Sequence, residues 1–303
     1  MRTTPIRQAL FIAAVGSATF VAAQVPDATF DTTAIRESSA LQASRNQPGV
    51  FWTLSDSGNP AAIYALARDG RLLGSFEIEG VTNNDWEAMA LDDAGRIYIG
   101  DVGNNANRRR DLEVLVVEEP TVELEGNHRV GPPPAPLPVI ERLPYHYREQ
   151  VQPPDGRIRD FDCEGLFWAR GKLYLLTKER SSGGTVLYRF DQGATRPFLA
   201  RVGRFDFGDF AGPSGMTTTG ADASFDGATL AVLGYRAVFL FERPAEGDNY
   251  LSSQPTRTIR LSQGVTKQAE GIAWDGEDLL ISNEQGELHR IRQARSADRD
   301  QYP

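Results

Sequence analysis

Five stretches of this 303-residue chain align with one another, and that repetition limits the folds it can adopt. Each stretch holds short apolar strands separated by Asp-Gly or other glycine-containing turns. In the second stretch, "WEAMALDD" at 86–93 leads to "GRIYIGDVGNN" at 95–105 and then to "DLEVLVVEE" at 111–119. Helical periodicity is almost absent, so the alignment predicts an all-β protein built from strand repeats.

A fourth strand follows four of the five stretches, in the segments 72–80, 139–147, 198–207 and 256–262. The last stretch lacks one, and the N-terminal segment 27–35 is available to supply it. That pairing would close a ring by joining the two ends of the chain. Four-stranded units in radial repetition are typical of a β-propeller, which protects its sheet edges by closure. We therefore predict a β-propeller with five blades.

Six blades are the alternative, because Glu87 and Glu164 head successive units 77 residues apart, and that interval has room for a degenerate blade. The proline-rich segment 131–138 instead favours an extended surface insertion, covering about 120–138, between the third and fourth strands of the second blade. A β-sandwich would explain the strands but not their fivefold register.

The two ends of the chain carry different signals. Residues 1–23 contain Arg2 and Arg7, then an apolar run and small residues, which is the order of a secretory signal peptide. We expect a single domain over 24–294 and a disordered tail over 295–303. The apolar run is too short for a membrane anchor, so the sequence predicts a periplasmic or secreted bacterial protein.

Charge and composition narrow the partners. The formal net charge is −9, and removal of the two leader arginines makes it more negative, which disfavours nucleic acid and anionic lipid. A neutral or cationic partner fits better, and we expect a monomer. Cys163 is the single cysteine, so no intramolecular disulfide can form, and we expect it to be a small buried apolar residue. The three histidines are far apart, which argues against a zinc site.

In an up-and-down blade, the innermost strand begins at the same channel mouth where its neighbour ends. The alignment places Ser39, Glu87, Glu164, Asp222 and Glu270 at the starts of the inner strands. The neighbouring strands end at Asp56, Asp101, Lys178, Tyr235 and Asn283. Nearer the rim we expect Asn83, Asn84, Asp85 and Asp162, with Lys178, Arg180 and Arg236 as the offsetting bases.

So many carboxylates at one mouth predict a bound cation, because like charges in a confined space disfavour ionisation unless something compensates them. Oxygen ligands without His or Cys select a hard ion, with Ca²⁺ first and Mg²⁺ or Mn²⁺ as alternatives. The predicted ligands are Glu87, Glu164, Asp222, Glu270 and Asn283. The structural alternative is that carboxylates accept backbone N–H groups of the adjoining blade and staple the blades together.

The order of motifs, including "DWEAMA", "YIGDVGNN", "DCEGL" and "QAEGIAW", resembles a group of secreted bacterial propeller proteins without an assigned activity. More distantly, Glu164-Gly165 and Glu270-Gly271 are similar to the strand heads of gluconolactonase and regucalcin-like propellers, which hold a divalent ion on the channel axis. That resemblance implies a glutamate ligand at Glu270 or Glu164, an asparagine at Asn283 and an aspartate at Asp101 or Asp222. The chain departs from that family because those proteins have six blades and because an acid is expected at the head of four blades here.

Two functions remain open. The first is a metal-dependent hydrolase of a lactone, ester or phosphoester, in which Asp101 accepts a proton and Lys178 steadies the developing oxyanion. The predicted substrate-binding residues are Asp56, Asn104, Tyr235 and Arg236. The second function is a non-catalytic module that binds a small molecule, glycan or peptide of the cell envelope at the mouth. Asp56 and Asp101 lie in the matched turns "SDSGN" and "GDVGNN", where an Asp can also cap its own turn.

Overall fold

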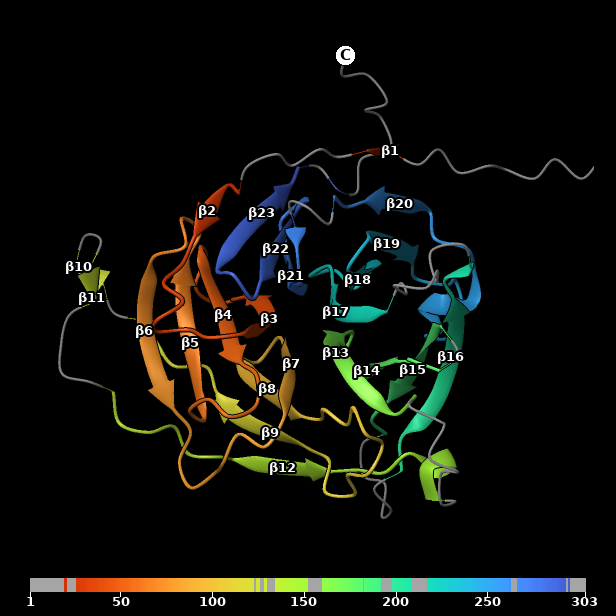
Figure 1. The fold of residues 1–303 in the computed structure, drawn as a ribbon, viewed down its shortest axis with the longest axis horizontal. Coiled ribbons are helices and arrows are strands. Elements are labelled where there is room, and N and C mark those ends of the chain that lie inside the picture. The colour runs from red at the N-terminus through yellow and green to blue at the C-terminus, as the bar shows by residue number, and fades with distance from the viewer. Residues whose placement is uncertain are drawn as a thin grey trace, which may run out of the picture.

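The computed structural model describes residues 19–20, 26–122, 124–125, 128–129, 134–151, 160–181, 183–191, 198–208, 217–262, 266–292 and 294. Within these ranges, five sheets, each with four antiparallel strands, surround a central channel (Figure 1). The prediction of an all-β, five-bladed propeller is therefore confirmed. Most of the predicted leader and the tail 295–303 lie outside the described residues.

Each blade follows the chain from the channel outwards. Blade 1 contains β3 (Ser38–Ala43), β4 (Val50–Ser55), β5 (Ala62–Ala67) and β6 (Leu72–Glu77). Blade 2 contains β7 (Trp86–Leu91), β8 (Arg96–Asp101), β9 (Glu113–Glu118) and β12 (Glu141–Pro144). Blade 3 contains β13 (Asp162–Ala169), β14 (Lys172–Lys178), β15 (Gly184–Arg189) and β16 (Ala200–Asp206). Blade 4 contains β17 (Thr218–Ala223), β18 (Thr229–Gly234), β19 (Ala237–Glu242) and β20 (Arg257–Arg260). Blade 5 contains β21 (Ala269–Asp275), β22 (Asp278–Asn283) and β23 (Glu287–Ile291).

The fourth strand of blade 5 comes from the N-terminal segment, as predicted. β2 (Ala28–Thr29) pairs antiparallel with β23, with Ala28 opposite Leu288. This pairing closes the ring between the two ends of the domain. β1 (Thr19–Phe20) pairs in parallel with β20, and because β1 lies within the predicted leader, cleavage would remove it.

The predicted insertion does run between the third and fourth strands of blade 2. It contains a hairpin that the sequence did not predict, formed by β10 (Leu124–Glu125) and β11 (His128–Arg129). Leu137 then bridges to Ile78 just beyond β6, so the insertion follows the outer edge of blade 1. The short 3₁₀ turns η1 (Arg148–Val151) and η3 (Tyr250–Ser252) complete the described elements, and no described helix is long and apolar enough to cross a membrane.

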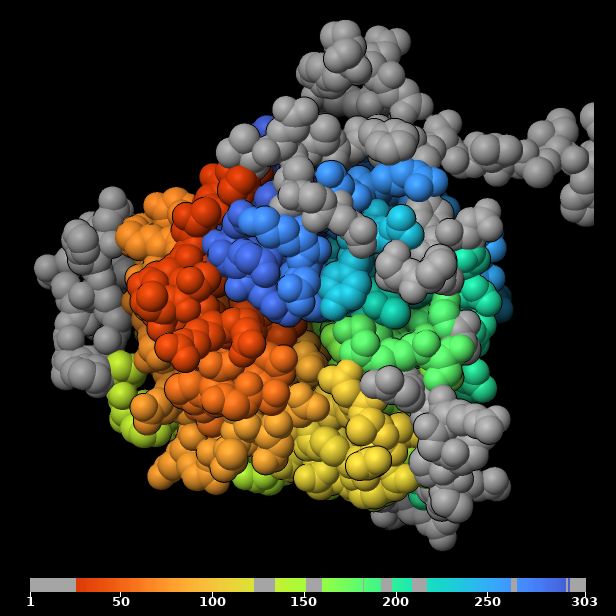
Figure 2. Space-filling model, in the orientation of Figure 1, coloured from red at the N-terminus to blue at the C-terminus, as the bar shows by residue number. Residues whose placement is uncertain are grey.

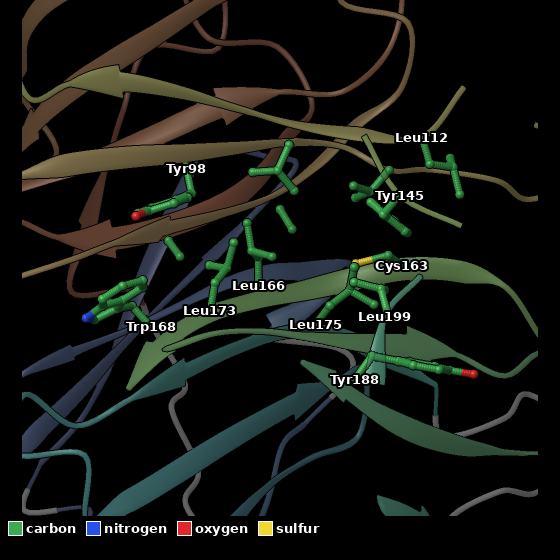
Figure 3. Packing of buried hydrophobic residues seen from close by; sticks show 14 of the residues in the cluster. Tyr98, Leu112, Tyr145, Cys163, Leu166, Trp168, Leu173, Leu175, Tyr188 and Leu199 are labelled. Carbon is green, nitrogen blue, oxygen red and sulfur yellow. The ribbon is translucent and has the colours of Figure 1, made fainter. Parts of the chain in front are cut away.

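The apolar core lies between neighbouring blades, which meet as contiguous sectors in the space-filling view (Figure 2). Between blades 2 and 3, Tyr98 stacks on Trp168 at a centroid distance of 5.5 Å. Cys163 is fully buried beside Tyr145 in the same cluster (Figure 3), and burial raises the pKa of its thiol. The prediction of a buried, apolar Cys163 is confirmed.

Every inner strand carries a β-bulge near its first residue. The bulge inserts one extra residue, whose side chain departs from the regular alternation between the two faces of the blade. The bulged residues are Ser39, Glu87, Glu164, Thr219 and Glu270. A glycine follows the bulge in blades 3, 4 and 5 because the inner strands pack closely there. A Cβ on Gly271 would lie 2.2 Å from Ser282 Oγ and 2.8 Å from Leu41 Cβ.

The bulge corrects one prediction, because Thr219 and not Asp222 heads the inner strand of blade 4. Asp222 lies towards the other end of β17, opposite Ala231. Its Oδ2 accepts a hydrogen bond of 2.8 Å from the backbone N–H of Trp274 in blade 5. Asp222 therefore links blades 4 and 5 and is not a residue of the acidic mouth.

Two of the bulged residues also join neighbouring blades. Ser39 Oγ donates to the carbonyl of Trp86 at 2.9 Å, and Thr219 Oγ1 donates to the carbonyl of Ala269 at 2.7 Å. In each case the acceptor carbonyl belongs to the residue directly before the bulged residue of the neighbouring blade. Stapling at the strand head thus uses hydroxyl groups, which leaves the three bulged glutamates for a different role.

We expect Thr219→Val to lower the free energy of unfolding by about 1–2 kcal/mol, because it removes the hydroxyl and leaves a buried carbonyl without its partner. Urea denaturation of the purified protein measures this loss. Thr121→Val, on the exposed surface, is the matched control and should change stability little. Equal stability of the two variants would show that the bulge hydroxyl does not hold the blades together.

Candidate functional site

A cavity of about 150 Å³ lies at the channel mouth where the inner strands begin. Its lining residues are Glu37, Ser39, Asp56, Glu87, Asn105, Glu164, Lys178, Arg180, Tyr235, Glu270 and Glu284. Six of these are acidic and two are basic, so the cavity carries the acid excess that the sequence predicted. The bulges position its innermost side chains.

The three bulged glutamates are nearly buried but have different partners. Glu164 forms an ion pair of 2.8 Å with Lys178, and both side chains are at most 4% exposed. Glu270 accepts a hydrogen bond of 2.8 Å from the hydroxyl of Tyr235. Glu87 is 7% exposed, and no hydrogen bond or ion pair joins it to any residue that the structure describes.

Lys178 is a fixed positive charge in this mouth. Burial alone would lower its pKa, but the Glu164 and Glu270 carboxylates outweigh that effect and raise the pKa above its usual value. The Lys178 ammonium also lies 5.4 Å from the centre of the Tyr235 ring. Lys178 is therefore protonated at neutral pH and cannot act as a base.

The glutamates hold protons more tightly than exposed carboxyls do. Burial raises the pKa of Glu164 despite its pairing with Lys178. Burial also raises the pKa of Glu270 to about 7, against the opposing effects of Lys178 and the Tyr235 hydrogen bond. The pKa of Glu87 is raised by burial first and then by the charge of Glu164 and other acids. An additional cation would relieve this crowding at Glu87.

Asp56, Asp85 and Glu87 are the candidate metal ligands between blades 1 and 2, since one carboxylate oxygen of each lies within 4.8 Å of the others. Asp85 has a pKa raised to about 6 by burial and by Asp56 and Asp162. Gly103 gives Asp85 its space, because a Cβ there would lie 2.3 Å from the Asp85 carboxyl carbon. Three converging carboxylate oxygens fit a hard divalent cation.

The structure brings six predicted site residues to the cavity, namely Asp56, Glu87, Glu164, Lys178, Tyr235 and Glu270. Five others do not line it, namely Asp101, Asn104, Asp222, Asn283 and Arg236. Predicted rim residues Asp85 and Arg180 lie at the site, with Asp85 in the three-carboxylate group and Arg180 in the lining. Arg180 pairs with Asp162 at 3.2 Å.

Asp101 was expected to accept a proton, but its carboxylate is already engaged. It pairs with Arg109 at 2.8 Å and accepts a hydrogen bond of 2.8 Å from the Asn84 side chain. Asp101 lies opposite Trp86, the residue before the bulge, and does not line the cavity. It orders the β8–β9 loop instead.

Asn283 and Asn104 also have structural roles. Asn283 caps its own turn, where its Oδ1 accepts hydrogen bonds from the backbone of Gln285 and Glu287. Asn104 joins blades 2 and 3 through its backbone N–H, which donates to Asp162 at 2.6 Å. In each turn the following residue, Glu284 or Asn105, lines the cavity instead.

Sequence reasoning missed Glu37, Asn105 and Glu284. Glu37 precedes its strand and has a left-handed backbone with φ of 49°, which no sequence pattern indicated. Asn105 and Glu284 each directly follow a turn asparagine that was predicted as a site residue, and this position is the sequence feature that could have identified them. A shift of one residue from Asn104 and from Asn283 leads to both.

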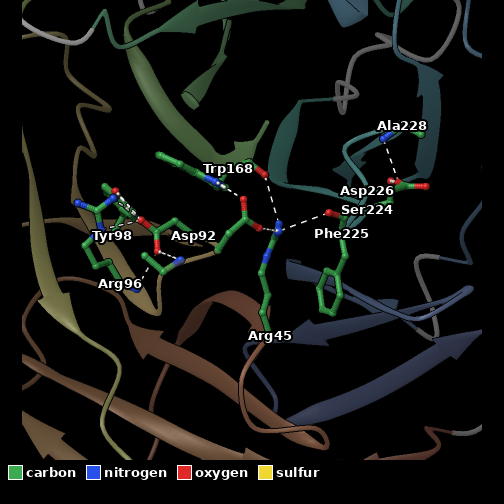
Figure 4. A network of polar contacts seen from close by, with 11 residues as sticks. Arg45, Asp92, Arg96, Tyr98, Trp168, Ser224, Phe225, Asp226 and Ala228 are labelled. Atoms are coloured by element: carbon green, nitrogen blue, oxygen red, sulfur yellow. Dashed lines mark hydrogen bonds and ion pairs between the residues drawn. The ribbon is translucent and has the colours of Figure 1, made fainter. Parts of the chain in front are cut away.

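The far mouth of the channel has a different character, because Arg45 reaches across it (Figure 4). Its guanidinium forms an ion pair with Asp93 of blade 2 and donates to the carbonyls of Trp168 and Phe225 at 3.5 Å. It also lies 4.9 Å from the centre of the Phe225 ring. Arg45 thereby connects blade 1 to blades 2, 3 and 4 opposite the acidic mouth.

No protein-family model matches the chain, and no curated protein is significantly similar in sequence. Among solved structures, it is similar to the PQQ-bound aldose sugar dehydrogenase of Streptomyces coelicolor, with 13% identity, a TM-score of 0.49, and coverage of 88% of this chain and 96% of that one. It is also similar to a candidate 6-phosphogluconolactonase of Bacteroides uniformis, with 15% identity, a TM-score of 0.41, and coverage of 83% and 70%. These neighbours are β-propellers, and the likeness is one of fold alone.

We expect Lys178→Met to lower the free energy of unfolding at neutral pH by about 3–5 kcal/mol, because Glu164 then remains buried without its partner. Loss of Lys178 raises the folded-state pKa of Glu164 further above its unfolded value. A carboxyl with a raised folded pKa binds its proton more tightly when folded, so the deficit is greatest above that pKa and shrinks as the pH falls. Urea denaturation across pH measures it.

Lys178→Met combined with Glu164→Gln is the matched control, and it should recover most of the lost stability because the buried charge is gone. A deficit that is independent of pH and persists in the double variant would mean that lost packing, and not electrostatics, is responsible.

Proposed function

We propose that this protein is an exported, periplasmic or secreted β-propeller that binds a divalent cation, Ca²⁺ in the first place, and hydrolyses a lactone, ester or phosphoester at its channel mouth. Mg²⁺ and Mn²⁺ are the alternative ions. The observation that carries the proposal is the convergence of Asp56, Asp85 and Glu87, in which Glu87 is buried and has no hydrogen-bond or ion-pair partner in the described part of the chain. We further propose that the protein acts as a monomer and binds neither nucleic acid nor membrane.

The ligand set differs from the one predicted from sequence. Glu164 and Glu270 have neighbours that satisfy them, whereas Glu87 has none among the described residues. A buried, unpaired carboxylate is costly in the folded state unless an ion compensates it. We therefore assign the cation to the blade 1 and blade 2 side of the mouth, with Asp56, Asp85 and Glu87 as protein ligands.

When bound, a divalent cation polarises a carbonyl or phosphoryl oxygen and lowers the pKa of a coordinated water. The chain supplies the remaining groups. Lys178, held by Glu164, provides a fixed positive charge for the developing oxyanion. Glu270 takes the proton-accepting role that we predicted for Asp101, because it lines the cavity and its pKa of about 7 suits proton transfer near neutral pH.

A non-catalytic binding module remains the second candidate. Lys178 and Arg180 both form ion pairs with acidic residues of blade 3. A network whose charged groups are all paired can bind a ligand as well as it can promote a reaction. The ligand would then be a small molecule, glycan or peptide that enters the mouth. Turnover separates the two candidates.

We predict that the mature protein binds one Ca²⁺ and that Glu87→Gln abolishes this binding while the protein stays folded. In chelator, the variant should melt at a higher temperature than the parent protein, because a desolvated acid surrounded by other acids has been removed. In calcium, the parent should gain stability by mass action and the variant should not. Calorimetric titration and thermal melts with and without calcium measure these changes.

Glu118→Gln, an exposed residue at the end of β9, is the matched control and should leave calcium binding unchanged. If Glu87 is a structural staple, Glu87→Gln will melt at a lower temperature in chelator. That result, or the absence of any calcium-dependent shift in the parent protein, contradicts the proposed site.

Turnover of p-nitrophenyl esters, simple lactones and phosphoesters tests the reaction itself. We expect hydrolysis by the calcium-loaded protein and its loss after chelation, with recovery when calcium is restored. Turnover that persists without metal defeats the metal-dependent mechanism. Calcium binding without any turnover of the three substrate classes favours the binding module.

A further inference from the structure

An open groove of about 430 Å³ adjoins the cavity, and two acidic residues, Glu37 and Glu284, line both spaces. The groove runs over turns of blades 5 and 1, and its remaining lining includes Arg36, Ser57 and Asn59. The cavity and the groove therefore meet at Glu37 and Glu284; we call the two spaces together the cleft and these two residues its junction. A ligand held in the cavity has room to extend outwards past these two carboxylates.

The junction carboxylates are held in place by neighbouring groups. The Asn59 side chain donates to Glu37 Oε2 at 3.0 Å, and the Gln268 side chain donates to Glu284 Oε1 at 2.9 Å. The left-handed backbone of Glu37 is consistent with a position that the surrounding structure fixes, and its carbonyl accepts the backbone N–H of Asp56 at 3.0 Å. The amides orient the two acids but do not neutralise them.

Acidic groups outnumber basic groups around the junction, although Arg36 lies in the groove lining and no hydrogen bond or ion pair joins Arg36 to Glu37 or Glu284 among the described residues. Lys178 and Arg180, the two bases of the cavity, are engaged by Glu164 and Asp162. Burial and then the charges of Glu37 and Asp56 raise the pKa of Glu284, which reflects the same crowding of acids. A divalent ion would compensate Asp56, Asp85 and Glu87, yet Glu37 and Glu284 would still face each other's charge. The excess of negative charge makes a cationic group the electrostatic complement of this junction.

The floor of the cleft also indicates that it receives a ligand, because Glu87 faces into the same cavity, is more than nine-tenths buried, and has no hydrogen-bond or ion-pair partner among the described residues. The groove side is lined by hydroxyl, amide and charged groups, and none of its described lining residues is aromatic or a large aliphatic. Such a surface suits a polar chain that forms hydrogen bonds and not an apolar one.

We propose that the natural ligand is an elongated polar molecule carrying an ammonium group, and that this group lies between Glu37 and Glu284 while its ends occupy the cavity and the groove. The inference rests on the proposed function, since it names the substrate class of the same mouth. An anionic ligand would meet repulsion at the junction. A neutral one would leave the two carboxylates uncompensated.

Three probes of equal chain length test the charge preference, namely 1,6-diaminohexane, 1,6-hexanediol and adipate. Each is titrated calorimetrically into the calcium-loaded mature protein. We expect the diamine to bind about fivefold more tightly than the diol, as one favourable ion pair allows, and adipate not to bind measurably. Glu37→Gln combined with Glu284→Gln should remove the diamine's advantage while calcium still binds at Asp56, Asp85 and Glu87, because neither substituted residue is a proposed metal ligand.

Glu118→Gln combined with Glu246→Gln is the control, because it makes the same change in net charge at exposed positions away from the cleft. Equal binding of diol and diamine, preferred binding of adipate, or a diamine preference that survives in the Glu37 and Glu284 double variant overturns the inference. Failure of calcium to bind counts against the proposed function instead. In that case the same titrations on the metal-free protein still decide whether the junction selects an ammonium group.

Discussion

The β-bulge at the head of every inner strand is the constraint on which the mouth of this propeller depends. Regular alternation would send successive side chains to the two faces of each blade, but one extra residue turns an additional side chain towards the channel. Serine and threonine at that position staple neighbouring blades, whereas the three glutamates enter the cavity. One backbone device therefore supplies both ring cohesion and the polar groups of the site.

The glutamates differ in function because their partners differ. Lys178 satisfies Glu164 and Tyr235 satisfies Glu270, so both acids can remain buried without an external group. Glu87 faces Asp56 and Asp85 instead, in an arrangement that is unfavourable for three ionised carboxylates alone. The asymmetry breaks the fivefold repetition and makes one side of the mouth suitable for a cation. Far from it, Arg45 ties four blades together at the opposite end of the channel.

The repetition of the sequence predicted the five blades, the strand that closes the ring and six of the cavity residues. It failed at single-residue precision, because a bulge adds a residue without any marker in the sequence. In blade 4 the search for an acid selected Asp222 over Thr219, and in two turns the prediction selected Asn104 and Asn283 in place of the residue that follows. Glu37 could not be found, since its place at the rim depends on a left-handed backbone. The spacing of residues in the sequence therefore identifies which strands form the mouth. The pairing register of those strands decides which side chains reach it.

The location of the ion tests the account most directly. A crystal of the mature protein grown with Mn²⁺ in place of Ca²⁺ would reveal the metal by its anomalous scattering. The account predicts a single strong peak bounded by Asp56, Asp85 and Glu87, on the blade 1 and blade 2 side of the mouth. A peak on the channel axis among Glu87, Glu164 and Glu270, or no peak at a saturating concentration of the ion, would contradict it.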